Sequence, residues 1–279
     1  MIGVTCLNPA IDHTLEVGQL SPGMVHRASA SFMGAGGKGI NVTRVLETLG
    51  TEAVCYGFLG CENAEAFLGM LGRMPLCAQR VQGRVRVNTK IISKIPQLRV
   101  TEINEPGPTV CEESIGELLT KMRKQRDSMD FLVLTGSMPP GCPDDLYRRW
   151  ICEVGVPTVL DTSGPALREG ILAKPFMIKP NRDELEELLG RSLVSLQEIA
   201  AAALAMHREG IEAVLVSLGS EGALLACNEG VLYTAPLPVQ VFSTVGAGDA
   251  MVAGFLSGYH KTGSFREGLG IGDWGLGPI

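Results

Sequence analysis

Short runs of apolar, β-branched residues alternate along this chain with segments of helical periodicity. Fully apolar runs predict buried strands at 2–7, 53–59, 131–136, 157–162, 176–180 and 213–219. Apolar residues that recur every three to four positions predict helices at 39–49, 112–124, 144–153, 183–189, 196–209 and 247–259. Strands that are apolar along their whole length and separated by helices are typical of a mostly parallel sheet covered on both faces. The pattern therefore predicts an α/β protein.

Four further segments alternate polar with apolar residues instead, at 13–17, 25–33, 84–92 and 98–104. Such alternation is typical of half-exposed antiparallel strands. We therefore expect a small β-sheet whose strands lie within about 13–33 and 84–104 and are inserted into the α/β body. The whole chain, 1–279, is expected to be a single domain. One face of this sheet would be free to cover a cleft or to meet another subunit.

Composition narrows the class of protein. The chain has 24 basic and 30 acidic residues, a net charge of −6 and no basic block, which argues against nucleic acid and anionic membranes as partners. Its eight cysteines are scattered without a CxxC pair, so a zinc site is not expected and the thiols are read as reduced. The first residues, MIGVTCLNPAID, do not have the pattern of a signal peptide, and no stretch is apolar enough to span a membrane. A cytoplasmic protein is expected.

The stretch STVGAGDAMVAGF, 243–255, places a glycine turn at the start of a predicted helix. Gly246, Ala247 and Gly248 offer backbone N–H groups at the positive end of the helix dipole, which favours an anion such as a phosphate. Asp249 follows in the first turn. A carboxylate there binds phosphate poorly but can accept a proton from a hydroxyl that attacks the phosphate. The alternative is an ordinary acidic residue at a helix start.

Two further segments carry candidate polar groups. Lys38 lies among glycines in GAGGKGINV, where it faces an anion or is a solvated surface lysine. Asp12 in NPAID follows the first strand, where ligands of open α/β sheets bind, and could accept hydrogen bonds from sugar hydroxyls or simply form a turn. Arg86, Asn88 and Lys90 alternate along one predicted strand and suit a phosphoryl group, unless they are charges on a solvated edge strand.

Three loops after predicted strands complete the set. Asn181 and Glu184 in IKPNRDELEELLG are one helical turn apart, so they could hold a water-coordinated Mg²⁺ or form an N-cap with an acidic first turn. VSLGSEGAL, 216–224, could approach a nucleotide or be a β-turn. TGSMPPG, 135–141, also follows a strand.

Taken together, these motifs resemble those of the PfkB (ribokinase-like) carbohydrate kinases. GGKGINVTRVLETLG and STVGAGDAMVAGF are similar to the two signatures of that family, and the other motifs follow in the same order over roughly 1–268. LNPAID, RVNTKI and EINEPGP resemble the hexose-phosphate branch, which contains 1-phosphofructokinases and tagatose-6-phosphate kinases. The run from Arg86 to Lys90 is more similar to the former.

The resemblance implies a three-layer α/β/α sandwich with a small β-sheet lid, ATP and Mg²⁺ as cofactors, and a homodimer formed through the lid. The implied reaction is phosphorylation of a ketohexose phosphate, with fructose 1-phosphate as the expected acceptor. Tagatose 6-phosphate, or an inactive sugar-phosphate-binding homologue, are the alternatives.

The resemblance also implies residue roles. Asp249 would be the catalytic base, and Gly246, Ala247 and Gly248 the anion hole. The sugar phosphate would be bound by Asp12, Gly37, Lys38, Asn41, Arg86, Asn88 and Lys90. The nucleotide would lie by Lys179, Asn181, Ser217, Gly219 and Gly222, with Glu184 near Mg²⁺. Two segments depart from the family pattern. Ser243 stands where the general motif has Asp, and the residues after about 268 are Gly-rich, which suggests a truncated or aberrant ending.

Overall fold

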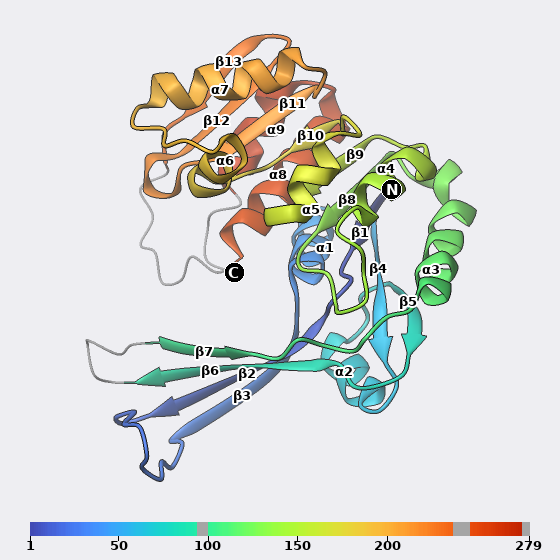
Figure 1. Cartoon of the computed structure of the whole chain (residues 1–279), viewed down its shortest axis with the longest axis vertical. Coiled ribbons are helices and arrows are strands. Elements are labelled where there is room, and N and C mark those ends of the chain that lie inside the picture. Colours follow the sequence, from blue (N-terminus) through green and yellow to red (C-terminus); the bar gives the residue numbers. More distant parts are fainter. Residues whose placement is uncertain (94–99, 237–245, 275–279) are drawn as a thin grey trace.

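A large twisted sheet forms the centre of the molecule (Figure 1). The computed structural model describes residues 1–93, 100–236 and 246–274, and within these residues the large sheet has nine strands. They run in the order β13-β12-β11-β10-β9-β8-β1-β4-β5. Their bounds are β1 (Ile2–Thr5), β4 (Ala53–Gly60), β5 (Leu76–Val81), β8 (Phe131–Thr135), β9 (Thr158–Asp161), β10 (Met177–Ile178), β11 (Ala213–Ser217), β12 (Ala223–Cys227) and β13 (Gly230–Thr234).

Pairing from β5 to β11 is parallel throughout, and only β12 and β13 are antiparallel. The chain winds from β1 through β4 to β5 on one side, then returns to β8 on the other side of β1 and continues outward. The strand order thus reverses between β1 and β8. In open parallel sheets, ligands bind beyond the carboxyl ends of the strands at such a point.

Helices cover both faces of this sheet, so the three layers expected for the fold are present. One face carries α3 (Glu112–Lys124), α4 (Leu146–Val154), α5 (Gly164–Ile171), α6 (Arg182–Leu189) and α7 (Leu196–Arg208). The other carries α1 (Lys38–Thr48), α2 (Ala64–Leu71), α8 (Ala247–Thr262) and α9 (Phe265–Trp274).

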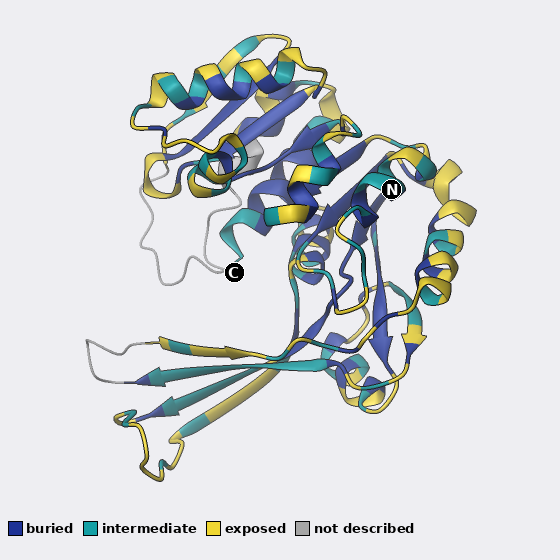
Figure 2. Cartoon of the chain, viewed as in Figure 1, coloured by how far each residue is buried: buried dark blue, intermediate teal, exposed yellow. Residues whose placement is uncertain are grey.

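Alternate residues of one strand serve the two cores. Leu132 and Leu134 of β8 pack on the α3–α7 side, whereas Phe131 and Val133 pack against α1 and α8. Burial on both sides explains why the strands are apolar along their whole length. Figure 2 shows them mostly dark blue, between helices that carry both buried and exposed residues. No described helix has the length and apolar character needed to cross a membrane.

A second, four-stranded sheet projects from the body (Figure 1) and is called the small sheet below. It consists, in the order β3-β2-β6-β7, of β2 (Ala10–Val17), β3 (Ala30–Gly36), β6 (Arg86–Ser93) and β7 (Val100–Asn104). The expectation that it is antiparallel is wrong at its centre, because β2 and β6 are parallel. These two strands are separated by β3, α1, β4, α2 and β5, and such a long connection can return the chain in the same direction.

Every strand and helix predicted from periodicity in the large body is present. The segment at 25–33 is shifted, since β3 begins at Ala30 and runs through Gly36 almost directly into α1. Sequence reasoning did not predict α2, α5, α9, β5, β12 or β13. Helix α9 packs on α8 through buried Phe265 and Leu269, and its second half lies in the segment whose sequence departs from the family pattern. Residues 243–245 of the glycine-turn motif lie outside the described residues.

Candidate active site

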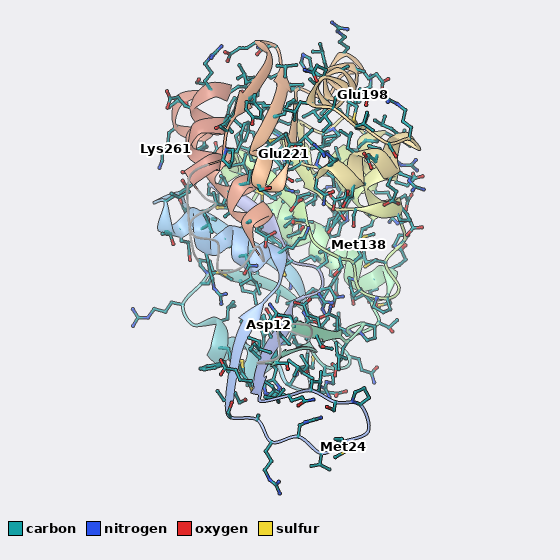
Figure 3. All side chains as sticks on the ribbon, turned by 90° about the vertical axis from the view of Figure 1, so that its left-hand side faces the viewer. Asp12, Met24, Met138, Glu198, Glu221 and Lys261 are labelled. Atoms are coloured by element: carbon teal, nitrogen blue, oxygen red, sulfur yellow. The ribbon has the colours of Figure 1, made fainter. Side chains whose placement is uncertain are left out.

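Side chains from both sheets converge on one cavity of about 630 Å³. The cavity lies where the carboxyl ends of the strands face the small sheet. Figure 3 shows Asp12, one of its lining residues, between the body and the tip of the small sheet at Met24. Fourteen of the predicted site residues line it: Asp12, Gly37, Lys38, Asn41, Arg86, Asn88, Lys90, Lys179, Asn181, Glu184, Ser217, Gly246, Gly248 and Asp249.

Asp249 is the most buried carboxylate of this cavity, with 4% of its surface exposed. Burial raises the pKa of its carboxyl group, and a hydrogen bond from Asn41 opposes that rise. Asn41 Nδ2 donates to Asp249 Oδ2 at 2.9 Å, across the junction between α1 and α8. The bond holds one carboxylate oxygen in place, as a positioned proton acceptor requires.

The first turn of α8 lies at the same place. Gly246 is the N-cap of the helix and has a φ of 84°, a left-handed conformation that glycine adopts without strain. Glycine has no side chain to cap the first turn. The N–H groups of a helix's first turn have no partner within the helix, so they form an anion site. Lys179 Nζ lies beside Gly248, about 3.3 Å from where a Cβ atom would stand, and adds a positive charge.

Two lysines of the cavity wall, Lys38 and Lys179, form ion pairs with the buried Asp161, a residue that was not predicted from sequence. Asp161, at the end of β9, accepts hydrogen bonds from Thr135 Oγ1 at 3.0 Å and from Lys179 Nζ at 3.1 Å. Lys38 Nζ is 3.8 Å from Asp161 Oδ2, the oxygen that also accepts from Thr135. Burial alone would raise the pKa of Asp161, but the two lysines and these hydrogen bonds outweigh it and lower the pKa.

The pKa of Lys179, the partner of Asp161, is shifted in the opposite direction. Burial lowers the pKa of Lys179, yet the charge of Asp161 and their hydrogen bond outweigh it and leave the pKa raised. Asp161 therefore holds two cations in the wall of the cavity. A charged residue that ends an otherwise apolar strand, as in PTVLDT, is the sequence signal that could have identified it.

Strand register brings the small sheet's polar groups together. Ala10, Asp12 and Thr14 of β2 stand opposite Arg86, Asn88 and Lys90 of β6, so the even-numbered residues share the face turned to the cavity. Asn88 Nδ2 donates to Asp12 Oδ1 at 3.2 Å. A Cβ atom at Gly36 would stand 1.8 Å from Asp12 Oδ2, so glycine is needed there for the carboxylate to lie against β3.

The two cations of β6 are held differently. Arg86 donates to the carbonyl oxygens of Asn8 at 3.1 Å and Glu105 at 3.4 Å, and to Ser137 Oγ at 3.4 Å. It also borders an adjoining cavity of about 880 Å³ that includes the TGSMPPG loop. Lys90 Nζ forms an ion pair with Glu102 of the neighbouring strand β7 at 3.4 Å. Both residues line the 630 Å³ cavity.

Asn181 and Glu184 form the capping box of α6, which was the alternative considered for them. Asn181 Oδ1 accepts from the Glu184 N–H at 2.8 Å, and Glu184 Oε2 accepts from the Asn181 N–H at 2.9 Å. Both side chains nevertheless line the cavity, so the cap orients them toward it.

Three predicted residues do not line the cavity within the described part of the chain. Ala247 lies in the first turn of α8, and Gly219 and Gly222 belong to the short turn that connects β11 to β12. The cavity also includes Thr14, Thr89, Glu102, Asn104, which sequence reasoning did not single out. Their places follow from the pairing of β6 with β7 and β2, which local sequence does not specify.

Comparison with known proteins gives a consistent result. The model of the pfkB family of carbohydrate kinases matches residues 2–274. A 1-phosphofructokinase of Haemophilus influenzae is 38% identical over 94% of this chain and 85% of its own length, and one of Bacillus subtilis is 34% identical over 98% and 90%. A crystal structure of phosphofructokinase-2 from Escherichia coli in complex with fructose-6-phosphate is 27% identical with a TM-score of 0.88, over 97% of this chain and 90% of that one.

Proposed function

Because the chain belongs to the pfkB family of carbohydrate kinases, we propose that it phosphorylates a hydroxyl of a ketohexose phosphate, with ATP as the donor that the family implies. The observation that carries this proposal is the buried Asp249, held by Asn41 at the open first turn of α8. A proton acceptor and an anion site are thereby adjacent, as transfer of a phosphoryl group to a hydroxyl requires.

In the proposed reaction, Asp249 takes the proton of a primary sugar hydroxyl as its oxygen attacks the γ-phosphate. The N–H groups of Gly248 and its neighbours and the ammonium of Lys179 stabilise the negative charge on the transferred group. Asp161 keeps Lys179 charged and in place from below. Ser217 lines the cavity on the nucleotide side of the proposal, and Gly219 and Gly222 belong to the turn that follows it.

The small sheet supplies the sugar-phosphate side of the proposal. Asp12, fixed by Asn88, accepts hydrogen bonds from sugar hydroxyls, while Arg86, Lys90 and Lys38 bind the phosphate of the acceptor. Fructose 1-phosphate is the proposed acceptor because the relatives with the name 1-phosphofructokinase share more identity with this chain than the phosphofructokinase-2 structure does.

Mg²⁺ belongs to the proposal as well. The cavity offers hard oxygen donors in Glu184, Asn181 and Asp249, which fits an ion that takes most of its ligands from phosphates and water. When bound, Mg²⁺ neutralises charge on the phosphates. We assign Glu184 to it through water, since one carboxylate oxygen is engaged in the capping box.

A homodimer through the small sheet is the last part of the proposal. Register places Leu15, Met33, Ile91 and Ile103 on the face opposite Asp12 and Lys90. Met33 and Ile103 are 53% and 57% exposed, which leaves apolar area that a second copy would cover.

Release of ADP tests the function, with fructose 1-phosphate, tagatose 6-phosphate and fructose 6-phosphate offered in parallel. Asp249→Asn should lower kcat by about 10²–10⁴-fold, because it removes the proton acceptor and keeps the side chain's shape. The sugar phosphate should still raise the melting temperature of this variant, because its binding does not need the proton acceptor.

Each outcome of that assay has a definite meaning. Turnover of one sugar that is lost in Asp249→Asn supports the proposal and identifies the acceptor, including tagatose 6-phosphate if that sugar reacts. A higher melting temperature with a sugar phosphate, but no turnover of any sugar, would mean that the protein is an inactive sugar-phosphate-binding homologue and not a kinase. Unchanged turnover in Asp249→Asn would refute the role of Asp249.

A further inference from the structure

Within the described residues, four segments of the chain connect the small sheet to the body (Figure 1). They are residues 6–9 between β1 and β2, residue 37 between β3 and α1, residues 82–85 between β5 and β6, and residues 105–111 between β7 and α3. Arg86 begins β6 directly after the third segment. The position of its guanidinium relative to the body therefore depends on how these segments are held together.

Backbone carbonyls of two of these segments hold Arg86. Its Nε donates to the carbonyl oxygen of Asn8 at 3.1 Å, and its Nη1 donates to that of Glu105 at 3.4 Å. The two segments are also joined to each other, because Asn8 Nδ2 donates to the carbonyl oxygen of Pro106 at 2.9 Å. A shift of either segment would therefore move the guanidinium.

Glu105 is hydrogen-bonded to β6 through both its backbone and its side chain. The register pairs of β6 with β7 end at Asn88 and Asn104. Beyond them, the Glu105 N–H donates to the carbonyl oxygen of Val87 at 3.4 Å, and Glu105 Oε2 accepts from the Val87 N–H at 2.9 Å. A side-chain oxygen thus takes the place of the next backbone acceptor, at the residue that follows Arg86.

The negative charge of Glu105 contributes less than its oxygen does. Its only printed ion pair joins Oε1 to Arg84 Nη2 at 3.5 Å, between side chains that are 42% and 55% exposed. Ion pairs of this exposure and length add little to stability. The bond to the Val87 N–H needs an acceptor oxygen, which a glutamine side chain also has.

From these contacts we propose that Glu105 is a positioning residue for the acceptor's phosphate. By holding the Val87 N–H, it keeps Arg86 between the carbonyl oxygens of Asn8 and Glu105, at the border of both cavities. A guanidinium has more N–H donors than its contacts here use, so it can still bind a phosphate. The binding of phosphate by Arg86 rests on the proposed function, whereas its position in the fold does not.

Steady-state kinetics of Glu105→Ala and Glu105→Gln test the role. In Glu105→Ala we expect the KM for fructose 1-phosphate to rise about tenfold, because Arg86 is no longer held in place, while kcat and the KM for ATP change by less than about twofold. In Glu105→Gln the amide oxygen accepts from Val87, so the KM should stay close to that of the unsubstituted protein. Equal changes of KM in both variants would overturn the proposal, since they would mean that Glu105 acts through its charge.

Exchange of the Val87 amide hydrogen for deuterium, followed by NMR, tests the contact without any turnover. Exchange should be slow in the unsubstituted protein and in Glu105→Gln, and faster by about tenfold or more in Glu105→Ala. Fast exchange in the unsubstituted protein would overturn the proposal, and that result needs no variant to fold.

Failure of the proposed function would be recognised separately. If no sugar phosphate is turned over, the dissociation constant of fructose 1-phosphate, measured by calorimetry, takes the place of KM. Weaker binding in Glu105→Ala that Glu105→Gln restores would support the positioning role although the protein is not a kinase. Equal dissociation constants, or no binding to the unsubstituted protein, would overturn it.

Glu112→Ala is the matched control. Both oxygens of Glu112 accept from Arg149, at 3.1 and 3.3 Å, and neither described cavity includes this glutamate. The variant removes a surface carboxylate with a closer ion pair than that of Glu105, but no contact with β6. Its KM for fructose 1-phosphate should be unchanged. A rise as large as that in Glu105→Ala would contradict the proposal, because loss of any surface carboxylate would then be sufficient.

Discussion

At the scale of single residues, the contact between Asn41 and Asp249 leads to a pH prediction. Asp249 must be deprotonated to act as a base, so activity is present above its pKa and is lost as the pH falls through it. Burial raises this pKa and the Asn41 hydrogen bond limits the rise. Asn41→Ala should therefore move the acidic limb of kcat to higher pH. Asn181→Ala, which removes another cavity amide, should leave the limb in place, and an unmoved limb in Asn41→Ala would contradict the role of the contact.

At the scale of elements, the start of α6 separates a structural from a chemical role. Asn181→Ala removes the cap and should lower the free energy of unfolding by about 1 kcal/mol. Glu184→Gln keeps an oxygen that accepts from the Asn181 N–H but removes the charge. Its stability should change little, while the Mg²⁺ concentration for half-maximal activity rises about tenfold or more. Chemical unfolding and Mg²⁺ titration of kcat measure the two effects, and an unaltered Mg²⁺ requirement would leave Glu184 as a capping residue alone.

At the scale of the whole molecule, the proposed dimer can be tested on the two faces of β7. Ile103 lies on the face opposite the cavity, and Val100, 52% exposed, lies on the same face as Lys90. Ile103→Lys should convert a dimer into monomers, because it places a charge in the covered apolar area, whereas Val100→Lys should not. Sedimentation velocity measures both masses. A monomeric unsubstituted protein, or dissociation by Val100→Lys alone, would be evidence against this face.

The local pattern of the chain was sufficient for its class of fold and for most of its motifs. Apolar runs and helical periodicity predicted the buried strands and the helices between them, because burial on one or two faces leaves a direct trace in the sequence. Motifs that follow such strands were expected at one edge of the sheet, and most of them line one cavity. Helices α2 and α5 were missed because each has only eight residues and contains glycine, a weak helix former, whereas α6, which is equally short, has none.

Contacts between distant segments were decided only by the tertiary structure. The parallel pairing of β2 with β6, the hydrogen bond from Asn41 to Asp249 and the cluster of Asp161 with two lysines each join segments far apart in the chain. Periodicity reports which face of an element is buried, but not which element covers it. Partner and register are fixed by packing of the whole chain.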